Sequence, residues 1–218
     1  MALKLDDKLV IGVSSRALFD LEEENKIFTD NGLEAYSQYQ IEHEDDILKP
    51  GTAFPLIKAL QKLNADGNNL TEILIMSKNS ADTSLRIFNS IEHYKLNISR
   101  AALVSGAPIA PYLDAFKTDL FLSANDKDVQ EAINANIAAG IICDHSQLPI
   151  NPDGNIEQIR IAFDGDAVIF SDESEKIYQA EGLEAFAIHE QKNAQNPLPE
   201  GPFAKLLKTI SLIQQKFT

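Results

Sequence analysis

Short apolar runs alternate with longer segments of helical periodicity between Leu9 and Cys143. Each run is bounded by polar residues and is typical of a buried strand. The predicted strands are Leu9–Val13, Ile73–Met76, Ala101–Val104, Leu120–Leu122 and Ile137–Cys143. The predicted helices are Asp20–Gln40 with a break at Gly32, Phe54–Leu63, Asp82–Tyr94, Tyr112–Phe116 and Asp128–Ala135. Strands separated by helices predict an α/β fold with a parallel, Rossmann-like sheet and helices on both faces.

Small polar residues follow each predicted strand. These residues are Ser14, Ser77, Ser105, Asn125 and Asp144. In parallel sheets the functional groups gather at the carboxyl ends of the strands, where the strand order changes direction. A crevice that handles phosphate would need small polar groups of this kind. The alternative stays open for each residue, because strand ends are polar wherever a loop meets water.

A further apolar run, Ile159–Phe163, ends abruptly in Asp164-Gly165-Asp166 and predicts another buried strand. Two carboxylates two residues apart at the end of such a strand repel each other, and burial penalises both. A cation would relieve this cost, and Mg²⁺ binds through one or two carboxylates together with substrate phosphate. A carboxylate in this position can also attack phosphorus. The alternative is an ordinary surface turn at the Asp-Gly pair.

The chain contains an internal repeat at an offset of 150 positions. Ala17–Tyr36 matches Ala167–Phe186, with identical residues at several places. The identical pairs are Lys26 with Lys176, Ile27 with Ile177, and Gly32-Leu33-Glu34-Ala35 with Gly182-Leu183-Glu184-Ala185. In this register, Ser14-Ser15-Arg16 takes the place of Asp164-Gly165-Asp166. The bend therefore does not require two carboxylates, and this favours a functional role for them.

The repeat predicts two parts of the chain. Residues 1–150 form a first Rossmann-like repeat, and residues 151–218 form the start of a second one that carries the acidic pair and the helices after it. The Pro149–Gly154 segment between them has the composition of a linker. The second copy stops shortly after Lys208, whereas the first continues through four more predicted strands.

Net charge, cysteine content and the length of the apolar runs indicate the kind of partner and compartment to expect. With 218 residues and a formal net charge of -14, the chain is a poor match for nucleic acid or an anionic membrane. The single cysteine, Cys143, excludes an internal disulfide and fits a reducing compartment. No apolar run approaches the roughly 20 residues of a membrane helix. These features predict a cytoplasmic protein.

Several motifs together resemble the cytosolic 5'-nucleotidases of type I, in the haloacid dehalogenase-like superfamily. The motifs are V-S-S-R-A-L-F-D (13–20), S-K-N-S-A-D-T (77–83), F-N-S-I-E-H-Y (88–94), D-L-F-L-S-A-N (119–125), F-D-G-D-A-V-I-F-S-D-E (163–173) and L-P-E-G-P-F (198–203). The resemblance runs from about Leu9 to the end of the chain. It implies a Mg²⁺-dependent phosphatase that acts on nucleoside 5'-monophosphates, AMP-like in the best-known members.

The resemblance also implies roles for individual residues. Asp164 would be the nucleophile that forms an aspartyl phosphate, and Asp166 the general acid and base. Both would ligate Mg²⁺, with Asp126 as a further metal ligand. Ser77, at the end of a second strand, corresponds to a substrate-binding position. Ser14, Ser15 and Arg16 are the other predicted substrate-binding residues.

Three hypotheses follow for the chain as a whole. In the first, it is a 5'-nucleotidase or part of one. In the second, it is an inactive nucleotide-binding or assembly module, because the superfamily's lysine and second acidic cluster do not follow Asp164 in this sequence, and loss of one member of a catalytic set usually removes most of the rate. In the third, the strand that carries Asp164 pairs with another copy of the chain and forms a homo-oligomer.

Overall fold

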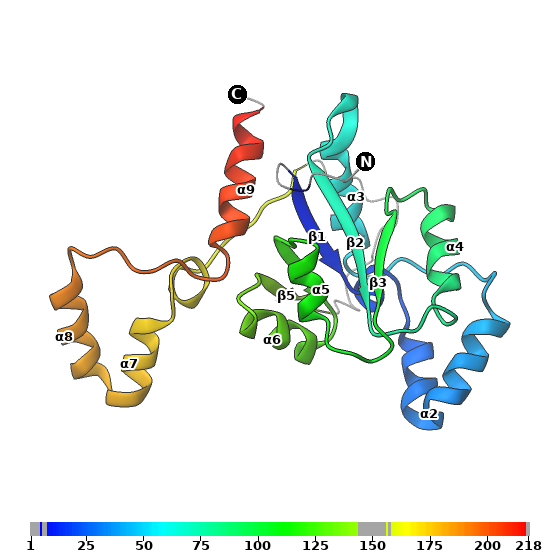
Figure 1. The fold of residues 1–218 in the computed structure, drawn as a ribbon, viewed down its shortest axis with the longest axis horizontal. Helices are drawn as coiled ribbons and strands as arrows, with labels where there is room; N and C mark the ends of the chain where they lie inside the picture. Colours follow the sequence, from blue (N-terminus) through cyan, green and yellow to red (C-terminus); the bar gives the residue numbers. More distant parts are fainter. Residues whose placement is uncertain (1–4, 6–7, 144–155, 157, 217–218) are drawn as a thin grey trace. The chain divides into compact units, whose positions relative to one another are not determined.

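The computed structural model describes Leu5, residues 8–143, Ile156 and residues 158–216. The chain divides into two compact units, Met1–Ile159 and Arg160–Thr218. Figure 1 shows the helices and strands of each unit as a ribbon. The predicted linker Pro149–Gly154 and Asp144 lie outside the described residues.

The first unit contains a sheet of five parallel strands. They are β1 (Leu9–Val13), β2 (Thr71–Ser77), β3 (Arg100–Leu103), β4 (Leu120–Ser123) and β5 (Ala139–Ile141). Their order across the sheet is β3-β2-β1-β4-β5, so β1 is central. All four pairings are parallel. The prediction of an α/β fold with a parallel Rossmann-like sheet is confirmed.

Helices connect the strands of the first unit. They are α1 (Ser15–Leu18), α2 (Glu22–Glu42), α3 (Phe54–Gln61), α4 (Leu85–His93), α5 (Ala110–Ala115) and α6 (Asp126–Asn134), and a 3₁₀ segment, Lys62–Gly67, follows α3. The break predicted within α2 is present, because Gly32 has φ 84° and interrupts the helix. That φ lies in the region that glycine adopts without steric cost.

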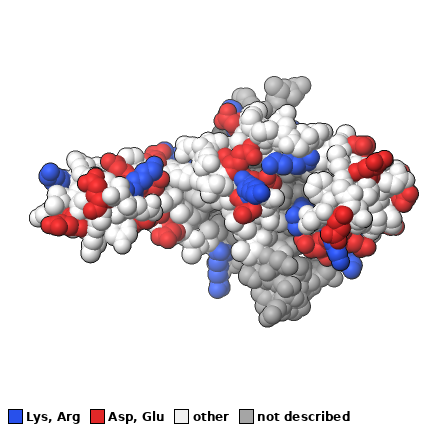
Figure 2. All heavy atoms as spheres, turned by 90° about the horizontal axis from the view of Figure 1, so that it is seen from below, with Lys and Arg blue, Asp and Glu red and all other residues white. Residues whose placement is uncertain are grey.

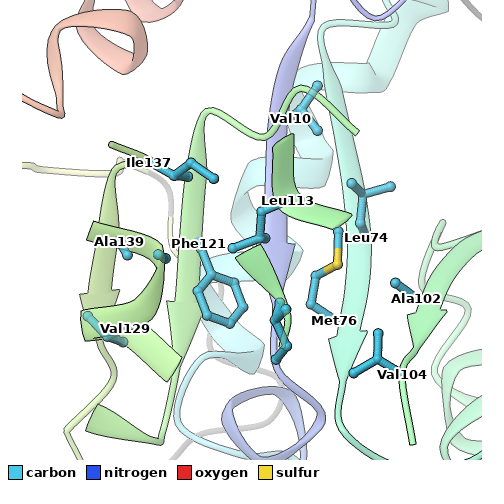
Figure 3. Packing of buried hydrophobic residues seen from close by; sticks show 12 residues of the cluster. Val10, Leu74, Met76, Ala102, Val104, Leu113, Phe121, Val129, Ile137 and Ala139 are labelled. Atoms are coloured by element: carbon cyan, nitrogen blue, oxygen red, sulfur yellow. The ribbon is translucent and has the colours of Figure 1, made fainter. Parts of the chain in front are cut away.

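Alternate residues of the strands build a core on each face of the sheet, because successive side chains of a strand point to opposite faces. Figure 3 shows the cluster on the face covered by α5 and α6. It comprises Val10, Leu74, Met76, Ala102, Val104, Ile109, Leu113, Phe121, Val129, Ala132, Ile137 and Ala139. On the opposite face α3 packs against β2, where Ile57, Ile73 and Ile75 are buried. The two layers hold the strand ends in place.

The described residues of the second unit, 160–216, form a turn and three helices. The turn covers Gly165–Ile169, and the helices are α7 (Glu173–Glu181), α8 (Leu183–Asn193) and α9 (Ala204–Gln215). Tyr178 of α7 and Phe186 of α8 meet edge to face, with ring centroids 6.2 Å apart. Gly182, between α7 and α8, has φ 86°.

The prediction of a buried strand at Ile159–Phe163 is wrong. No strand is present among the described residues 158–164, and Ile161 is 54% exposed. A strand needs a neighbouring strand for its ladder of hydrogen bonds, and the described residues of the second unit contain no strand that could pair with this segment. Pairing of this segment with a second copy of the chain stays a prediction.

The acidic turn is one residue longer than the turn it matches in the first unit. The amide of Phe19 donates to Ser15 O, four residues back, at 2.9 Å, whereas the amide of Phe170 donates to Gly165 O, five residues back, at 3.0 Å. The offset of 150 positions is therefore locally broken at the turn. It is restored at Gly182, which lies 150 positions after Gly32 and has nearly the same φ.

Within the described residues, no helix is long and apolar enough to cross a membrane.

Candidate functional site

A cavity of about 450 Å³ lies at the carboxyl edge of the sheet in the first unit. Its volume falls within the range of small-molecule sites. The lining residues are Ser14, Ser15, Arg16, Leu21, Glu24, Asn25, Phe28, Leu33, Tyr36, Met76, Ser77, Lys78, Asn79, Ser80, Thr83, Ser105, Gly106, Ser123, Asn125 and Asp128.

The position of the cavity follows from the strand order. The chain builds β2 and β3 on one side of β1 and then crosses to place β4 and β5 on the other. The connections after β1 and β4 therefore diverge, which leaves a crevice at the carboxyl ends of these strands. Ser14 follows β1, and Ser123 is the last residue of β4. Both line the cavity.

Buried hydroxyl groups form the floor of the cavity. Ser15 Oγ and Ser77 Oγ lie 3.2 Å apart, although their residues are 62 positions apart in sequence. Ser14 caps α1, because its Oγ accepts a hydrogen bond from Ala17 N at 3.2 Å. The amide of Ala124 also donates to Ser14 Oγ, at 3.4 Å. These bonds fix the hydroxyl groups in place beside the strand ends.

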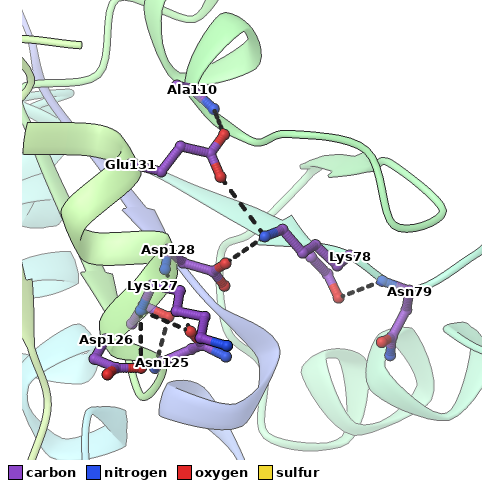
Figure 4. A network of polar contacts seen from close by, with 10 residues as sticks. Lys78, Asn79, Ala110, Asn125, Asp126, Lys127, Asp128 and Glu131 are labelled. Carbon is purple, nitrogen blue, oxygen red and sulfur yellow. Dashed lines mark hydrogen bonds and ion pairs between the residues drawn. The ribbon is translucent and has the colours of Figure 1, made fainter. Parts of the chain in front are cut away.

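Lys78 supplies a fixed positive charge on one side of the cavity. Its Nζ donates to Asp128 Oδ1 at 2.6 Å and lies 3.6 Å from Glu131 Oε2. Figure 4 shows the lysine reaching from the end of β2 to these two residues of α6. Burial lowers the pKa of Lys78, but the hydrogen bond to Asp128 and the two carboxylate charges outweigh it and raise the pKa above its usual value. Lys78 is therefore protonated at neutral pH.

Arg16 is the second cation of the cavity. One terminal nitrogen, Nη2, donates to Glu22 Oε1 at 2.8 Å, and the Arg16 side chain is 33% exposed. Its Nε is shielded from solvent and has no hydrogen-bond partner among the described residues. Arg16 therefore keeps unused donor capacity at the cavity.

The two halves of α2, on either side of the break at Gly32, contribute the apolar wall. Its members are Leu21, just before α2, Phe28 in the first half, and Leu33 and Tyr36 in the second, and all four line the cavity. Phe28 is 49% exposed and Leu33 is 65% exposed. The rings of Phe28 and Tyr36 meet edge to face, with centroids 5.9 Å apart. The wall thus presents an aromatic pair whose apolar surface is only partly covered.

Tyr36 joins this wall to the end of β2. Its hydroxyl accepts hydrogen bonds from Asn79 Nδ2 at 2.8 Å and Gln40 Nε2 at 3.0 Å. Burial is the largest cause that raises the pKa of Tyr36 above its usual value. The phenol therefore stays neutral, and its own hydrogen can be donated to a ligand.

A buried ion pair adjoins the apolar wall, and its carboxylate, Glu24, also lines the cavity. Glu24 accepts a hydrogen bond from Arg86 Nη1, and their side chains are 5% and 10% exposed. Arg86 also donates to the carbonyl of Asp46, which ties α4 to the loop after α2. The charge of Glu24 is thus neutralised by Arg86, as that of Asp128 is by Lys78.

The acidic turn lies in the second unit. Asp164 has extended backbone (φ -72°, ψ 158°) and its Oδ1 accepts a hydrogen bond from Gly165 N at 2.7 Å. Ser14 has the same conformation at the start of α1 (φ -71°, ψ 149°). Asp164 and Asp166 are both exposed. The two positions are locally alike, but only the second offers carboxylates.

A bracing segment, Pro199–Phe203, holds the acidic turn through three backbone hydrogen bonds. They join Ser171 N to Pro199 O (2.8 Å), Gly201 N to Ile169 O (2.9 Å) and Phe203 N to Val168 O (3.2 Å). Gly201 is essential to this contact, because a Cβ there would lie 2.3 Å from Phe170 O and 2.4 Å from Val168 O. The turn is therefore fixed by backbone contacts rather than by burial in a sheet.

The donor set of the acidic turn suits a hard cation. Mg²⁺ uses one or two carboxylates and completes its shell with water and phosphate oxygens, and Asp164 and Asp166 supply two exposed carboxylates. Among the described residues, no group of three or more His, Cys, Asp or Glu side chains is placed to hold a metal ion. Asp126 is exposed at the start of α6 in the first unit, and its role as a metal ligand stays a prediction.

The structure brings four of the predicted site residues together. Ser14, Ser15, Arg16 and Ser77 all line the cavity, and substrate binding by them stays a prediction. Asp164 and Asp166 share the acidic turn of the second unit. Nothing in the structure tests their catalytic roles.

Sequence reasoning missed several residues of the cavity. Lys78 and Asn79 directly follow Ser77, so their place at a strand end is a usable signal. Phe28, by contrast, can be assigned only once the orientation of α2 is known. Asp128 can be assigned only once its contact with Lys78 is known, because helix periodicity alone does not distinguish an exposed carboxylate from one that pairs across the fold.

Among the charged side chains visible in Figure 2, the acidic ones predominate. Basic side chains are scattered among them on the visible face and form no continuous patch there. The formal net charge of the chain is -14, and the exclusion of nucleic acid as a partner stays a prediction.

The chain was compared with protein families and with known proteins. A family model described as 5'-nucleotidase matches residues 1–218. Human cytosolic 5'-nucleotidase 1B is 38% identical over 221 residues, which cover 98% of this chain and 36% of the human protein. The chain thus spans little more than a third of the length of this relative. No solved structure matches the chain significantly.

Proposed function

Because the chain belongs to the 5'-nucleotidase family, we propose that it hydrolyses nucleoside 5'-monophosphates, AMP among them, to nucleoside and phosphate with the help of Mg²⁺. The observation that carries the proposal is the acidic turn. Asp164 and Asp166 are exposed two residues apart, on a backbone that the bracing segment holds in one conformation.

In this proposal Asp164 is the nucleophile. One oxygen of its carboxylate forms a bond to phosphorus as the bond from phosphorus to the ribose O5' breaks, which leaves an aspartyl phosphate. Its other oxygen accepts the amide of Gly165, which limits the orientations of the carboxylate. Mg²⁺, when bound, neutralises the phosphate oxygens that would otherwise repel the carboxylate.

Asp166 moves the proton. In its protonated form it gives a proton to the departing O5', so that the nucleoside leaves as a neutral alcohol. As a carboxylate it then takes a proton from a water that attacks the aspartyl phosphate, which releases phosphate and restores Asp164. Each proton donated in the first step is regained in the second, so the cycle consumes only water.

The test is phosphate release from AMP and IMP in the presence of Mg²⁺. Asp164→Asn should lower kcat by at least about 1,000-fold, because an amide cannot form the phosphorylated intermediate. Asp166→Asn should lower kcat by about 100-fold or more, which is the usual contribution of general acid–base catalysis. Asp30→Asn, on the exposed face of α2, is the matched control and should keep wild-type activity.

Equal rates for wild type and Asp164→Asn would refute the nucleophile assignment. The second candidate function is a nucleotide-binding module without turnover, and it is favoured by the cavity, whose acidic residues Glu24 and Asp128 are both neutralised. Nucleotide binding by wild type without any phosphate release would support that candidate and contradict the nucleotidase.

A further inference from the structure

We infer that the cavity of the first unit binds a nucleoside monophosphate by itself, without divalent metal and without Asp164 or Asp166. That the ligand is a nucleotide rests on the proposed function. Binding of a flat ring joined to an anionic group follows from the apolar and polar residues that line the cavity.

The apolar wall fits a flat ring. Phe28 and Tyr36 offer an aromatic surface on α2, and Phe28 keeps half of its area exposed. Every nucleobase has a face that stacks on aromatic side chains. The neutral Tyr36 hydroxyl accepts two hydrogen bonds and has its own hydrogen to give, so one polar contact to the ligand is available at the same wall.

The polar part of the lining fits a phosphate group. Ser15 and Ser77 place two hydroxyl groups 3.2 Å apart, and each is at least nine-tenths buried. Arg16 adds the unused Nε donor, and Lys78 adds an ammonium group whose side chain is 38% exposed. Arginine and lysine are the usual partners of phosphate oxygens, because hydrogen bonds to charged groups are the strong ones.

Metal is not required at this site, because its cations are part of the chain. Of the residues that the structure describes, the carboxylates lining the cavity are Glu24 and Asp128, and they are paired with Arg86 and Lys78. A divalent cation would have to displace these partners. The acidic turn of the second unit has no such built-in cations in its Asp-Gly-Asp sequence, and this separates the two sites chemically.

Hydrolysis is not expected in the cavity. Ser14 takes the conformation that Asp164 has in the acidic turn, and its hydroxyl is used as a helix cap. A serine becomes a nucleophile only with a base beside it. Among the described lining residues there is no histidine, and the carboxylates of Glu24 and Asp128 are both paired. Binding without turnover is therefore the expected property of this cavity.

The test is calorimetric titration of the 218-residue chain that carries Asp164→Asn and Asp166→Asn, in EDTA. AMP should bind, and it should bind at least about tenfold more tightly than adenosine or inorganic phosphate, because only AMP reaches both the apolar wall and the polar part of the lining. Absence of AMP binding under these conditions would overturn the inference. Binding of inorganic phosphate as tightly as AMP would also overturn it, since the aromatic wall would then contribute nothing.

Two further substitutions, each made in the chain that carries Asp164→Asn and Asp166→Asn, test which residues of the cavity contact which part of the ligand. Arg16→Gln should weaken the binding of AMP by about tenfold or more, because it removes a charged donor to phosphate. It should leave the affinity for adenosine unchanged. Phe28→Ala should weaken the binding of AMP and of adenosine by similar factors. Lys26→Gln, an exposed lysine of α2 outside the cavity, is the matched control and should change neither.

Unchanged AMP affinity in both Arg16→Gln and Phe28→Ala would place binding elsewhere and refute the inference. Circular dichroism of each variant checks that the fold is kept. The outcome is separate from that of the nucleotidase assay. Loss of phosphate release in Asp164→Asn, together with no binding in EDTA, would reject only the metal-free site, whereas metal-free binding with full activity of Asp164→Asn would reject only the proposed catalysis.

Discussion

Lys78 shows how one residue can link stability and charge at the cavity. Its ammonium group joins the end of β2 to Asp128 and Glu131 on α6, and Glu131 in turn accepts the amide of Ala110 at the start of α5. Figure 4 shows this chain of contacts across three elements. The Asp128 side chain is only 10% exposed, so it depends on Lys78 for neutralisation.

Lys78→Met should therefore destabilise the protein. The substitution keeps most of the apolar stem and leaves Asp128 without its cation. We expect a loss of about 1–2 kcal/mol in the free energy of unfolding, less than for a fully buried pair because Lys78 is partly solvated. Urea denaturation measures it. Lys127→Met, at an exposed neighbouring position, should change stability by less than about 0.5 kcal/mol.

The effect of Lys78→Met should shrink at alkaline pH. The folded pKa of Lys78 is raised above its usual 10.5, so its stabilising contribution is complete below that pH and is lost as the pH rises through the folded value. The difference between wild type and Lys78→Met should therefore be constant from about pH 7 to 9 and become smaller above about pH 10.5. A difference that grows with pH would contradict the assigned charge pair.

At the residue scale, sequence patterns locate the strand-end residues but cannot show their contacts. Ser15 and Ser77 follow from the sequence as residues near the ends of separate strands, and they lie side by side in hydrogen-bond distance on the floor of the cavity. Their proximity depends on β1 and β2 being neighbours, which only the strand order supplies. The pairing of Lys78 with Asp128 depends in the same way on the position of α6 beside the end of β2.

Among the elements, the bracing segment of the second unit and the matching residues around Gly51 in the first unit depend on backbone contacts that a single methyl group would disturb. In the first unit, Gly51 N donates to Leu18 O at 2.8 Å, and a Cβ at Gly51 would lie 2.8 Å from backbone atoms of Ala17 and Phe19. In the second unit, the corresponding approach at Gly201 is closer still. Both glycines are needed for close approach, not for an unusual φ.

Gly201→Ala should separate the acidic turn from its bracing segment. Since the added Cβ would meet Phe170 O and Val168 O, the backbone hydrogen bonds must lengthen and the turn must shift. In the nucleotidase assay we expect kcat to fall by about 10-fold or more with a smaller change in KM, because misplaced reacting groups mainly affect the chemical step. Full activity of Gly201→Ala would show that the bracing segment does not position Asp164.

Gly140→Ala is the matched control. A Cβ there would meet only Leu122 Cδ2, at the ordinary distance of 3.7 Å. It should leave kcat and KM unchanged. The pair of variants compares the same chemical change at a tight and at an open position.

At the element scale, periodicity predicts the first unit well and the second less well. All five strands of the sheet and the break at Gly32 follow from short apolar runs and from a glycine within a helix. Residues 159–163 are similarly rich in apolar side chains but do not form a strand. A strand needs neighbours as well as apolar residues, and a sequence window contains no information on whether neighbours are present.

For the whole molecule, the core is distributed unequally between the two units. Every large side chain that is fully buried belongs to the first unit, among the described residues. In the second unit, α8 has no buried residue and α7 has only Ser174. Local stability depends on buried apolar contacts and protected backbone hydrogen bonds, so the two units should open at different free energies.

Native-state hydrogen exchange should resolve this difference. Amides of β1 and β2 should exchange at least about 100-fold more slowly than helical amides of α7 and α8, which corresponds to about 2.7 kcal/mol. Equal protection of the amides in the strands and in these helices would contradict the unequal stability of the two units. The cavity belongs to the first unit, and Ser14 and Ser77 of its lining lie at the ends of β1 and β2. A ligand that binds in the cavity should therefore slow amide exchange in β1 and β2. AMP added in EDTA should therefore slow exchange in the first unit and leave α7 and α8 unchanged.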